Sequence, residues 1–181
     1  MERKPQNQFI ISEMTTSDLD SSTEMRLQSW LDTYPNEEYG VTRKWVEEQN
    51  LRQMTTEKRE SRKERFEKGK AEDTVAGWVA KDASGKVIGA TTPWVDEDGT
   101  QHVGSLYVDK NWHGSGVGSA LMQKVVEWFD VSRPIVLGVA SYNNRAKAFY
   151  RKWGFEEIPD SEKLFNETIP EVHMVRKGDK Q

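Results

Sequence analysis

The chain contains 181 residues, none of them cysteine, and its formal net charge at pH 7 is −4. The length predicts a single domain over residues 1–181 with a full hydrophobic core. The lack of cysteine excludes disulfides, thiolate metal sites and a cysteine nucleophile. The mildly acidic charge argues against general nucleic-acid binding, and the sequence has no apolar run long enough to cross a membrane. Residues 1–5 also lack the apolar core of a signal peptide, so we expect a cytoplasmic protein.

Residues 8–70 carry the pattern of one strand followed by three helices. Phe9–Ile11 is a short apolar run, and Ser17 or Asp18 is placed to cap the helix that follows it. The expected elements are a strand at 9–11 and helices at 17–34, 41–51 and 55–70. The third helix alternates acids with its Lys and Arg residues, which favours a solvated helix face over a nucleic-acid patch.

Residues 74–109 read as an antiparallel meander, and residues 134–177 as further strands and a helix. Strands joined by tight turns are expected at 75–80, 87–95 and 102–108. A helix at 117–129, a strand at 135–140, a helix at 143–153 and strands at 156–158 and 172–176 complete the order. This order predicts an α/β fold of the α+β type, with a mixed, mostly antiparallel sheet of about six to seven strands flanked by helices.

A glycine-rich loop, His113–Gly118, follows an apolar strand and opens an amphipathic helix. Glycines let the backbone approach a ligand closely, and the unpaired N–H groups of a helix start favour an anion, most often phosphate. A P-loop would need lysine after the last glycine, where Ser119 stands. A dinucleotide fold would need G-x-G-x-x-G and an acid in the next strand, and neither is present.

The segment 106–130 resembles the acetyl-CoA-binding strand, loop and helix of the GNAT acetyltransferases, whose motif is Arg/Gln-x-x-Gly-x-Gly/Ala. The motif glycines fall on Gly116 and Gly118, and His113 replaces the common Arg or Gln. The resemblance implies that this segment holds the coenzyme through Leu106, Val108, His113, Gly114, Ser115, Gly116, Val117, Gly118 and Ser119.

A second motif follows at Asn143–Phe155, which is similar to the GNAT signature Asn-x-x-Ala-x-x-x-Tyr-x-x-x-Gly-Phe. The resemblance implies that Tyr150 points at the thioester sulfur and that Asn143 contacts the coenzyme arm. Each also has a plainer reading, because Asn143 is placed to cap a helix and Tyr150 is placed to pack in the core.

The GNAT resemblance implies an N-acetyltransferase that uses acetyl-CoA as cosubstrate and no metal. A primary amine of a small molecule or peptide would attack the thioester directly in a ternary complex, with Tyr150 as general acid. The N–H of Val108 would meet the thioester carbonyl. The general base stays open among His102, Tyr107, Glu37, Glu38 and a water chain.

The acceptor would bind between the N-terminal helices and the sheet. Five aromatic residues there either wall a pocket or pack in the core: Trp30, Tyr34, Trp45, Trp78 and Trp94. Aromatic rings near acids suit a cation, so a polyamine is one acceptor to consider. Two other readings stay open, a GNAT-fold module that binds CoA without turnover and a serine hydrolase acting through Ser115. The acyl chain length and the oligomeric state, a homodimer included, are left open.

Overall fold

The computed structural model describes residues 8–179, so the segment considered for a signal peptide lies outside the described residues. Eight strands and five α-helices follow in this order: β1 (Phe9–Glu13), α1 (Leu19–Thr33), α2 (Arg43–Gln53), α3 (Thr56–Ala71), β2 (Trp78–Asp82), β3 (Val87–Val95), β4 (Gln101–Val108), α4 (Val117–Trp128), β5 (Ile135–Ala140), α5 (Asn144–Arg151), β6 (Glu156–Glu157), β7 (Lys163–Phe165) and β8 (Ile169–Arg176). Within these described residues, no helix is both long and apolar enough to cross a membrane.

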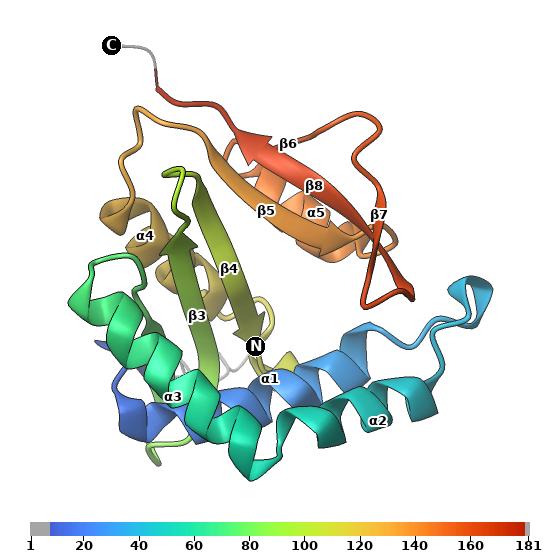
Figure 1. Ribbon diagram of the computed structural model, residues 1–181, viewed down its shortest axis with the longest axis horizontal. Helices are drawn as coiled ribbons and strands as arrows, with labels where there is room; N and C mark the ends of the chain where they lie inside the picture. The colour runs from blue at the N-terminus through green and yellow to red at the C-terminus, as the bar shows by residue number, and fades with distance from the viewer. Residues whose placement is uncertain (1–7, 180–181) are drawn as a thin grey trace, which may run out of the picture.

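The strands form one mixed sheet in the order β1-β2-β3-β4-β5-β8-β6, with β7 paired to β8. β4 and β5 run parallel, while the other neighbouring pairs are antiparallel. The predicted fold class, a mixed and mostly antiparallel sheet flanked by helices, is confirmed. In Figure 1, β3 and β4 form one half of the sheet and β5 and β8 the other.

The parallel contact between β4 and β5 is short. It pairs Gln101 with Ile135 and His102 with Val136, after which the two strands diverge (Figure 1). A shift of register between β3 and β4 lies next to Gly104, whose φ is +69° and where a Cβ would collide with the Thr92 carbonyl oxygen. Such a bulge bends a strand. The bend leaves the last residues of β4 without a neighbouring strand on the β5 side.

Helices cover both faces of β3 and β4, and alternate residues of β4 face them. Tyr107 packs in a core cluster with Met25 of α1, whereas Leu106 and Val108 pack with Leu121 of α4. Leu121 is fully buried, and burying a leucine stabilises a fold by roughly 1.5–3 kcal/mol. Successive residues of β4 therefore open to opposite sides of the sheet.

Three local predictions were wrong in detail. Asp18 does not cap α1, because its carboxylate accepts hydrogen bonds from the N–H and hydroxyl of Thr15 and pairs with Lys81 at 2.6 Å. The strand expected at 75–80 starts at Trp78, since Val75 instead bridges to Trp94. β7 was missed, because its three exposed residues give no apolar alternation.

Candidate active site

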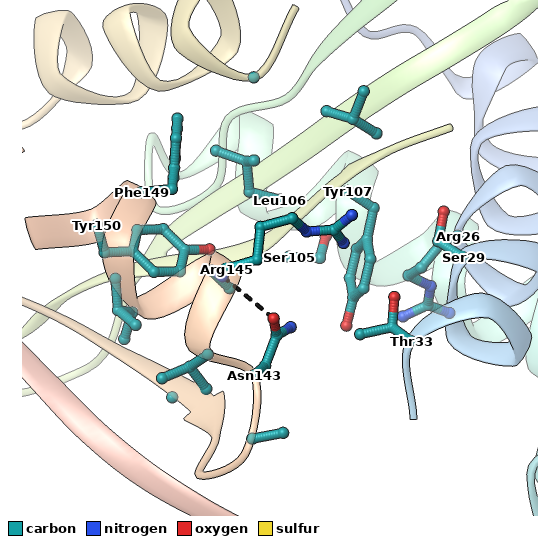
Figure 2. A pocket seen from close by; sticks show the side chains of 18 of the residues that line it. Arg26, Ser29, Thr33, Ser105, Leu106, Tyr107, Asn143, Arg145, Phe149 and Tyr150 are labelled. Atoms are coloured by element: carbon teal, nitrogen blue, oxygen red, sulfur yellow. Dashed lines mark hydrogen bonds between the residues drawn. The ribbon is translucent and has the colours of Figure 1, made fainter. Parts of the chain in front are cut away.

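One cavity of about 1070 Å³ fills the space where β4 and β5 diverge. Figure 2 shows Tyr150 and Asn143 on one side of it, α1 with Arg26 and Ser29 on the other, and β4 between them. Most of the residues predicted to bind coenzyme line this cavity: Leu106, Val108, His113, Gly114, Gly116, Gly118, Ser119, Asn143 and Tyr150.

Two predicted coenzyme-binding side chains point elsewhere. The Ser115 hydroxyl donates to the Trp112 carbonyl at 2.6 Å, and the Val117 side chain is fully buried against Leu121 and Ile88. Among the described residues, no histidine shares a hydrogen bond with Ser115, so a serine hydrolase site is not assembled there. The backbone N–H of Ser115 also donates to the Trp112 carbonyl, at 3.2 Å, so of these two residues only Val117 has a backbone N–H without a partner in the loop.

The glycine loop exposes backbone N–H groups toward the cavity. Gly114 and Gly116 have φ of +79° and +95°, and a Cβ on either would meet no atom within 4 Å. The first helical bond of α4 runs from the N–H of Ala120 to the carbonyl of Gly116. The N–H groups of residues 117–119 therefore have no partner within the helix, and the helix dipole adds partial positive charge there. This geometry suits a pyrophosphate.

His113 ties the loop to β4 instead of facing an anion. Its Nε2 donates to the Val108 carbonyl at 3.1 Å, and its Nδ1 accepts from the Arg145 guanidinium. Burial and the nearby Arg145 lower the pKa of His113, so the ring is neutral at neutral pH. Arg145 lines the cavity, as do Lys110 and Lys152, and the sequence motifs do not single out Arg145.

The backbone N–H of Val108 points into the opening between the strands. Val108 faces Gly89 of β3, and the next residue, Asp109, donates its N–H to the Ile88 carbonyl at 2.8 Å. This alternation marks Gly89 and Val108 as a non-hydrogen-bonded pair, whose N–H and C=O groups point away from each other's strand. The carbonyl is bound by His113, and the N–H is available to a ligand's oxygen.

Tyr150 is 7% exposed and packs edge-on against Phe149 and Phe155. Burial, with a smaller contribution from Tyr107, raises the pKa of Tyr150 well above its ordinary value, so its hydroxyl stays protonated. Asn143 caps α5, because its Oδ1 accepts the N–H of Ala146 at 3.1 Å (Figure 2). The cap fixes the start of the helix that carries Tyr150.

The opposite end of the cavity is aromatic. The hydroxyls of Tyr34 and Tyr107 share a hydrogen bond of 2.7 Å, and Trp30 packs edge-on against Tyr34. Trp94 also lines the cavity. Two of the five aromatics considered for this wall do not line it, since Trp45 and Trp78 pack against core clusters.

The candidates for the general base differ in whether they line the cavity. Glu37 and Glu38 form a short 3-10 turn and do not line the cavity. His102 lines it, but its Nε2 lies 2.9 Å from Asp96 Oδ2 and its ring stacks on Trp94. Tyr107 is partly buried, and desolvation of its hydroxyl raises its pKa and keeps it neutral.

A carboxylate that the sequence analysis missed, Glu171 of β8, lines the cavity together with His173. Burial raises the pKa of Glu171, and His173, with its Nε2 3.5 Å from the carboxylate, partly offsets the shift. The carboxylate lies over Gly138 of β5, where a Cβ would come within 2.5 Å of its Cδ. If the strand expected at 172–176 had been extended back by one residue, the alternation of side chains along a strand would have placed Glu171 and His173 on one face.

Residues 73–157 match the family model described as the acetyltransferase (GNAT) domain. This segment of the chain belongs to the GNAT superfamily. An uncharacterised N-acetyltransferase of Mycobacterium tuberculosis is 33% identical over 76 residues, which are 40% of this chain and 47% of that protein. The chain therefore spans about half the length of the curated relatives it matches.

The GNAT fold is shared with solved structures over almost the whole chain. The PaiA N-acetyltransferase of Thermoplasma acidophilum, solved with coenzyme A, has a TM-score of 0.71 at 19% identity and covers 94% of this chain and 99% of its own. A phosphinothricin acetyltransferase of Sinorhizobium meliloti, solved with acetyl-CoA, has a TM-score of 0.64 at 20% identity, covering 93% of this chain and 87% of its own. At these identities the likeness shows the fold. Within residues 8–179, no group of three or more His, Asp or Glu residues could hold a metal ion.

Proposed function

We propose that the protein is an N-acetyltransferase that moves an acetyl group from acetyl-CoA to a primary amine. The observation that carries the proposal is one cavity lined by the Val108 backbone, the glycine loop and the Tyr150 hydroxyl, with the Glu171 carboxylate on its far side. The loop suits the pyrophosphate of the coenzyme, and the divergence of β4 and β5 gives room for its extended arm.

Acetyl-CoA supplies the acetyl group as a thioester. The Val108 N–H stabilises the negative charge that develops on the thioester oxygen. As the new C–N bond forms and the C–S bond breaks, the amine loses a proton and the thiolate leaves. Tyr150 donates a hydrogen bond to that sulfur. Because its pKa is raised, the hydroxyl is protonated at neutral pH. Leu106 and Asn143 border the arm.

Glu171 is the general base of this proposal. It is a partly buried carboxylate whose pKa is raised toward the range in which a base works best at neutral pH. Its charge acts on both Tyr34 and Tyr107, which share a hydrogen bond at the acceptor end of the cavity. His102, held by Asp96, is the weaker candidate.

A free-thiol release assay with acetyl-CoA against a panel of amines tests the function, with Tyr150→Phe as the diagnostic variant. The panel holds polyamines, amino acids, aminoglycosides and peptide N-termini. We expect Tyr150→Phe to keep its affinity for CoA and to lower kcat by ~100-fold, in the range of general acid catalysis. If the wild type binds CoA but acetylates no amine of the panel, the result would favour the alternative, a CoA-binding module without activity.

The finer attributes stay proposals. The acceptor is a primary amine of a small molecule or peptide, no metal takes part, and neither nucleic acid nor membrane is a partner. The cytoplasmic location and the homodimer considered from the sequence remain predictions.

A further inference from the structure

The inward face of α1 carries a row of polar residues where a packed helix normally has apolar ones. Ser22, Arg26, Ser29 and Thr33 follow one another at helical spacing, and Ser22 and Ser29 are buried. The hydroxyls of Ser22 and Ser29 are satisfied within the helix by the carbonyls of Leu19 and Met25. Because burial of such residues adds little hydrophobic stabilisation, the row suggests a surface kept for a polar ligand.

This row borders two adjoining cavities. The second cavity, of about 470 Å³, lies between α1, α3 and the strands β3 and β4. Arg26, Trp94, Ser105 and Tyr107 line both it and the main cavity. On the sheet side, Ser105 shares a 2.6 Å hydrogen bond with Thr92. A ligand whose amine lies in the main cavity can therefore extend along α1 into the second one.

The second cavity contains an arginine with unused hydrogen-bond donors. Nη1 of Arg62 donates to the Gln53 carbonyl at 3.2 Å, but its Nε and Nη2 are buried and have no partner among the described residues. Arg26 and Arg65 line the same cavity. Burial, followed by the charge of Arg26, lowers the pKa of Arg62, while Asp20 opposes the shift and is itself paired with Arg59.

Guanidinium groups that line the same cavity repel each other, and their burial costs desolvation free energy unless an anion binds between them. A guanidinium with two parallel donors free matches a carboxylate or a phosphate in a bidentate way. A second cation, such as the far end of a polyamine, would add to the repulsion. The charge distribution on this side of the sheet therefore opposes the polyamine hypothesis.

We propose that Arg62, with Arg26, binds an anionic group on the acceptor, so that the acceptor is a primary amine that also carries a carboxylate or a phosphate. The proposal rests on the proposed acetyltransferase function. The amine reaches Glu171 in the main cavity, while the anionic group lies in the second cavity.

The test compares two series of acceptors in the thiol-release assay. The anionic series consists of ω-amino carboxylates of increasing chain length and also includes O-phosphoethanolamine. The neutral series consists of the corresponding amides and also includes ethanolamine. We expect kcat/KM for the best acid to exceed that for its amide by ~10- to 100-fold, as for hydrogen bonds to a charged group. Arg62→Met should remove this advantage, so that within this variant kcat/KM for the acid falls to that for its amide, and Arg62→Lys should keep part of the advantage. Arg43→Met, which breaks an exposed pair with Glu47 on α2, is the matched control.

A second measurement separates failure of this proposal from failure of the proposed function. Calorimetry with inorganic phosphate, carried out with excess CoA to fill the glycine loop, reports on Arg62 whether or not any amine is acetylated. Binding to the wild type and its loss in Arg62→Met supports the proposal. Equal phosphate binding in both proteins, or acids no better than their amides in an active enzyme, overturns it. Thermal unfolding of each variant confirms that it is folded.

Discussion

Gly138→Ala is expected to disable the general base while leaving the fold intact. Gly138 lies on β5 beneath the Glu171 carboxylate, and a Cβ there would stand 2.5 Å from the Glu171 Cδ. Ordinary contact begins at 3.4 Å, so the carboxylate must withdraw by about 0.9 Å. Because the colliding atoms end a flexible side chain, rotation of Glu171 relieves the contact without moving the backbone.

A displacement of this size is enough to be seen in kinetics. Misplacing a catalytic group by about 1 Å can lower the rate ~100-fold. Replacing glycine with alanine reduces the conformational entropy of the unfolded chain, which stabilises the folded state by ~0.4–1 kcal/mol. An off-rotamer Glu171 side chain costs ~0.5–1.5 kcal/mol. The two effects oppose each other, so the net change in unfolding free energy should stay within about 1 kcal/mol. The variant should therefore lose kcat with little change in Tm.

The measurement is kcat in the thiol-release assay for the wild type, Gly138→Ala, Glu171→Gln and the double variant, with urea unfolding of each. If Glu171 is the base, Gly138→Ala adds almost nothing to Glu171→Gln, because both remove the same interaction. Full activity in Gly138→Ala, or additive losses in the double variant, would refute the role assigned to Glu171.

Three further predictions concern pH, the coenzyme and stability. As a base, Glu171 must be ionised, so kcat/KM should rise with pH through a pKa above the ordinary 4.5, and Glu171→Gln should abolish this acid limb in a pH–rate profile. Gly116→Ala puts a side chain at φ +95°, which costs ~1–2 kcal/mol, and should raise KM for acetyl-CoA in steady-state kinetics. Burial alone would raise the pKa of Asp18, but hydrogen bonds from Lys81 and Thr15 outweigh it and lower the pKa. Asp18 therefore stabilises the fold above its ordinary pKa of 3.8 and loses this contribution in acid, and Asp18→Asn should cost ~1–3 kcal/mol at pH 7 in urea unfolding.

The elements that carry the predicted coenzyme-binding residues could be located from the sequence because their determinants are local. The glycine loop, the start of α4 and the register of Asn143 with Tyr150 lie within continuous segments, and their spacing survives folding unchanged. The same locality explains why the motif does not determine the direction of the His113 side chain. Its side chain reaches back to the Val108 carbonyl, a contact that depends on how β4 ends and that no motif spacing encodes.

The acceptor side depends instead on where distant strands and helices meet. Glu171 stands next to Gly138 because β8 pairs antiparallel with β5, and Arg62 faces Arg26 because α3 folds back over α1. In the sequence, Arg62 sits in a helix rich in both charges, where solvent exposure is the natural expectation. Only the packed structure shows that two of its donors are buried without a partner.

The two halves of the cavity also differ in how they are stabilised, and this difference constrains the chemistry. The proposed coenzyme end presents backbone N–H groups and a neutral His113, which accepts a hydrogen bond from Arg145. At the acceptor end, the negative Glu171 lies on β8, whereas the positive Arg26 and Arg62 lie on α1 and α3. An acceptor with an amine at one end and an acid at the other neutralises both, whereas a polyamine satisfies Glu171 alone and leaves Arg62 unpaired. In the proposed reaction, charge balance across β4 therefore selects the acceptor, while the backbone at Val108 and the glycine loop selects the donor.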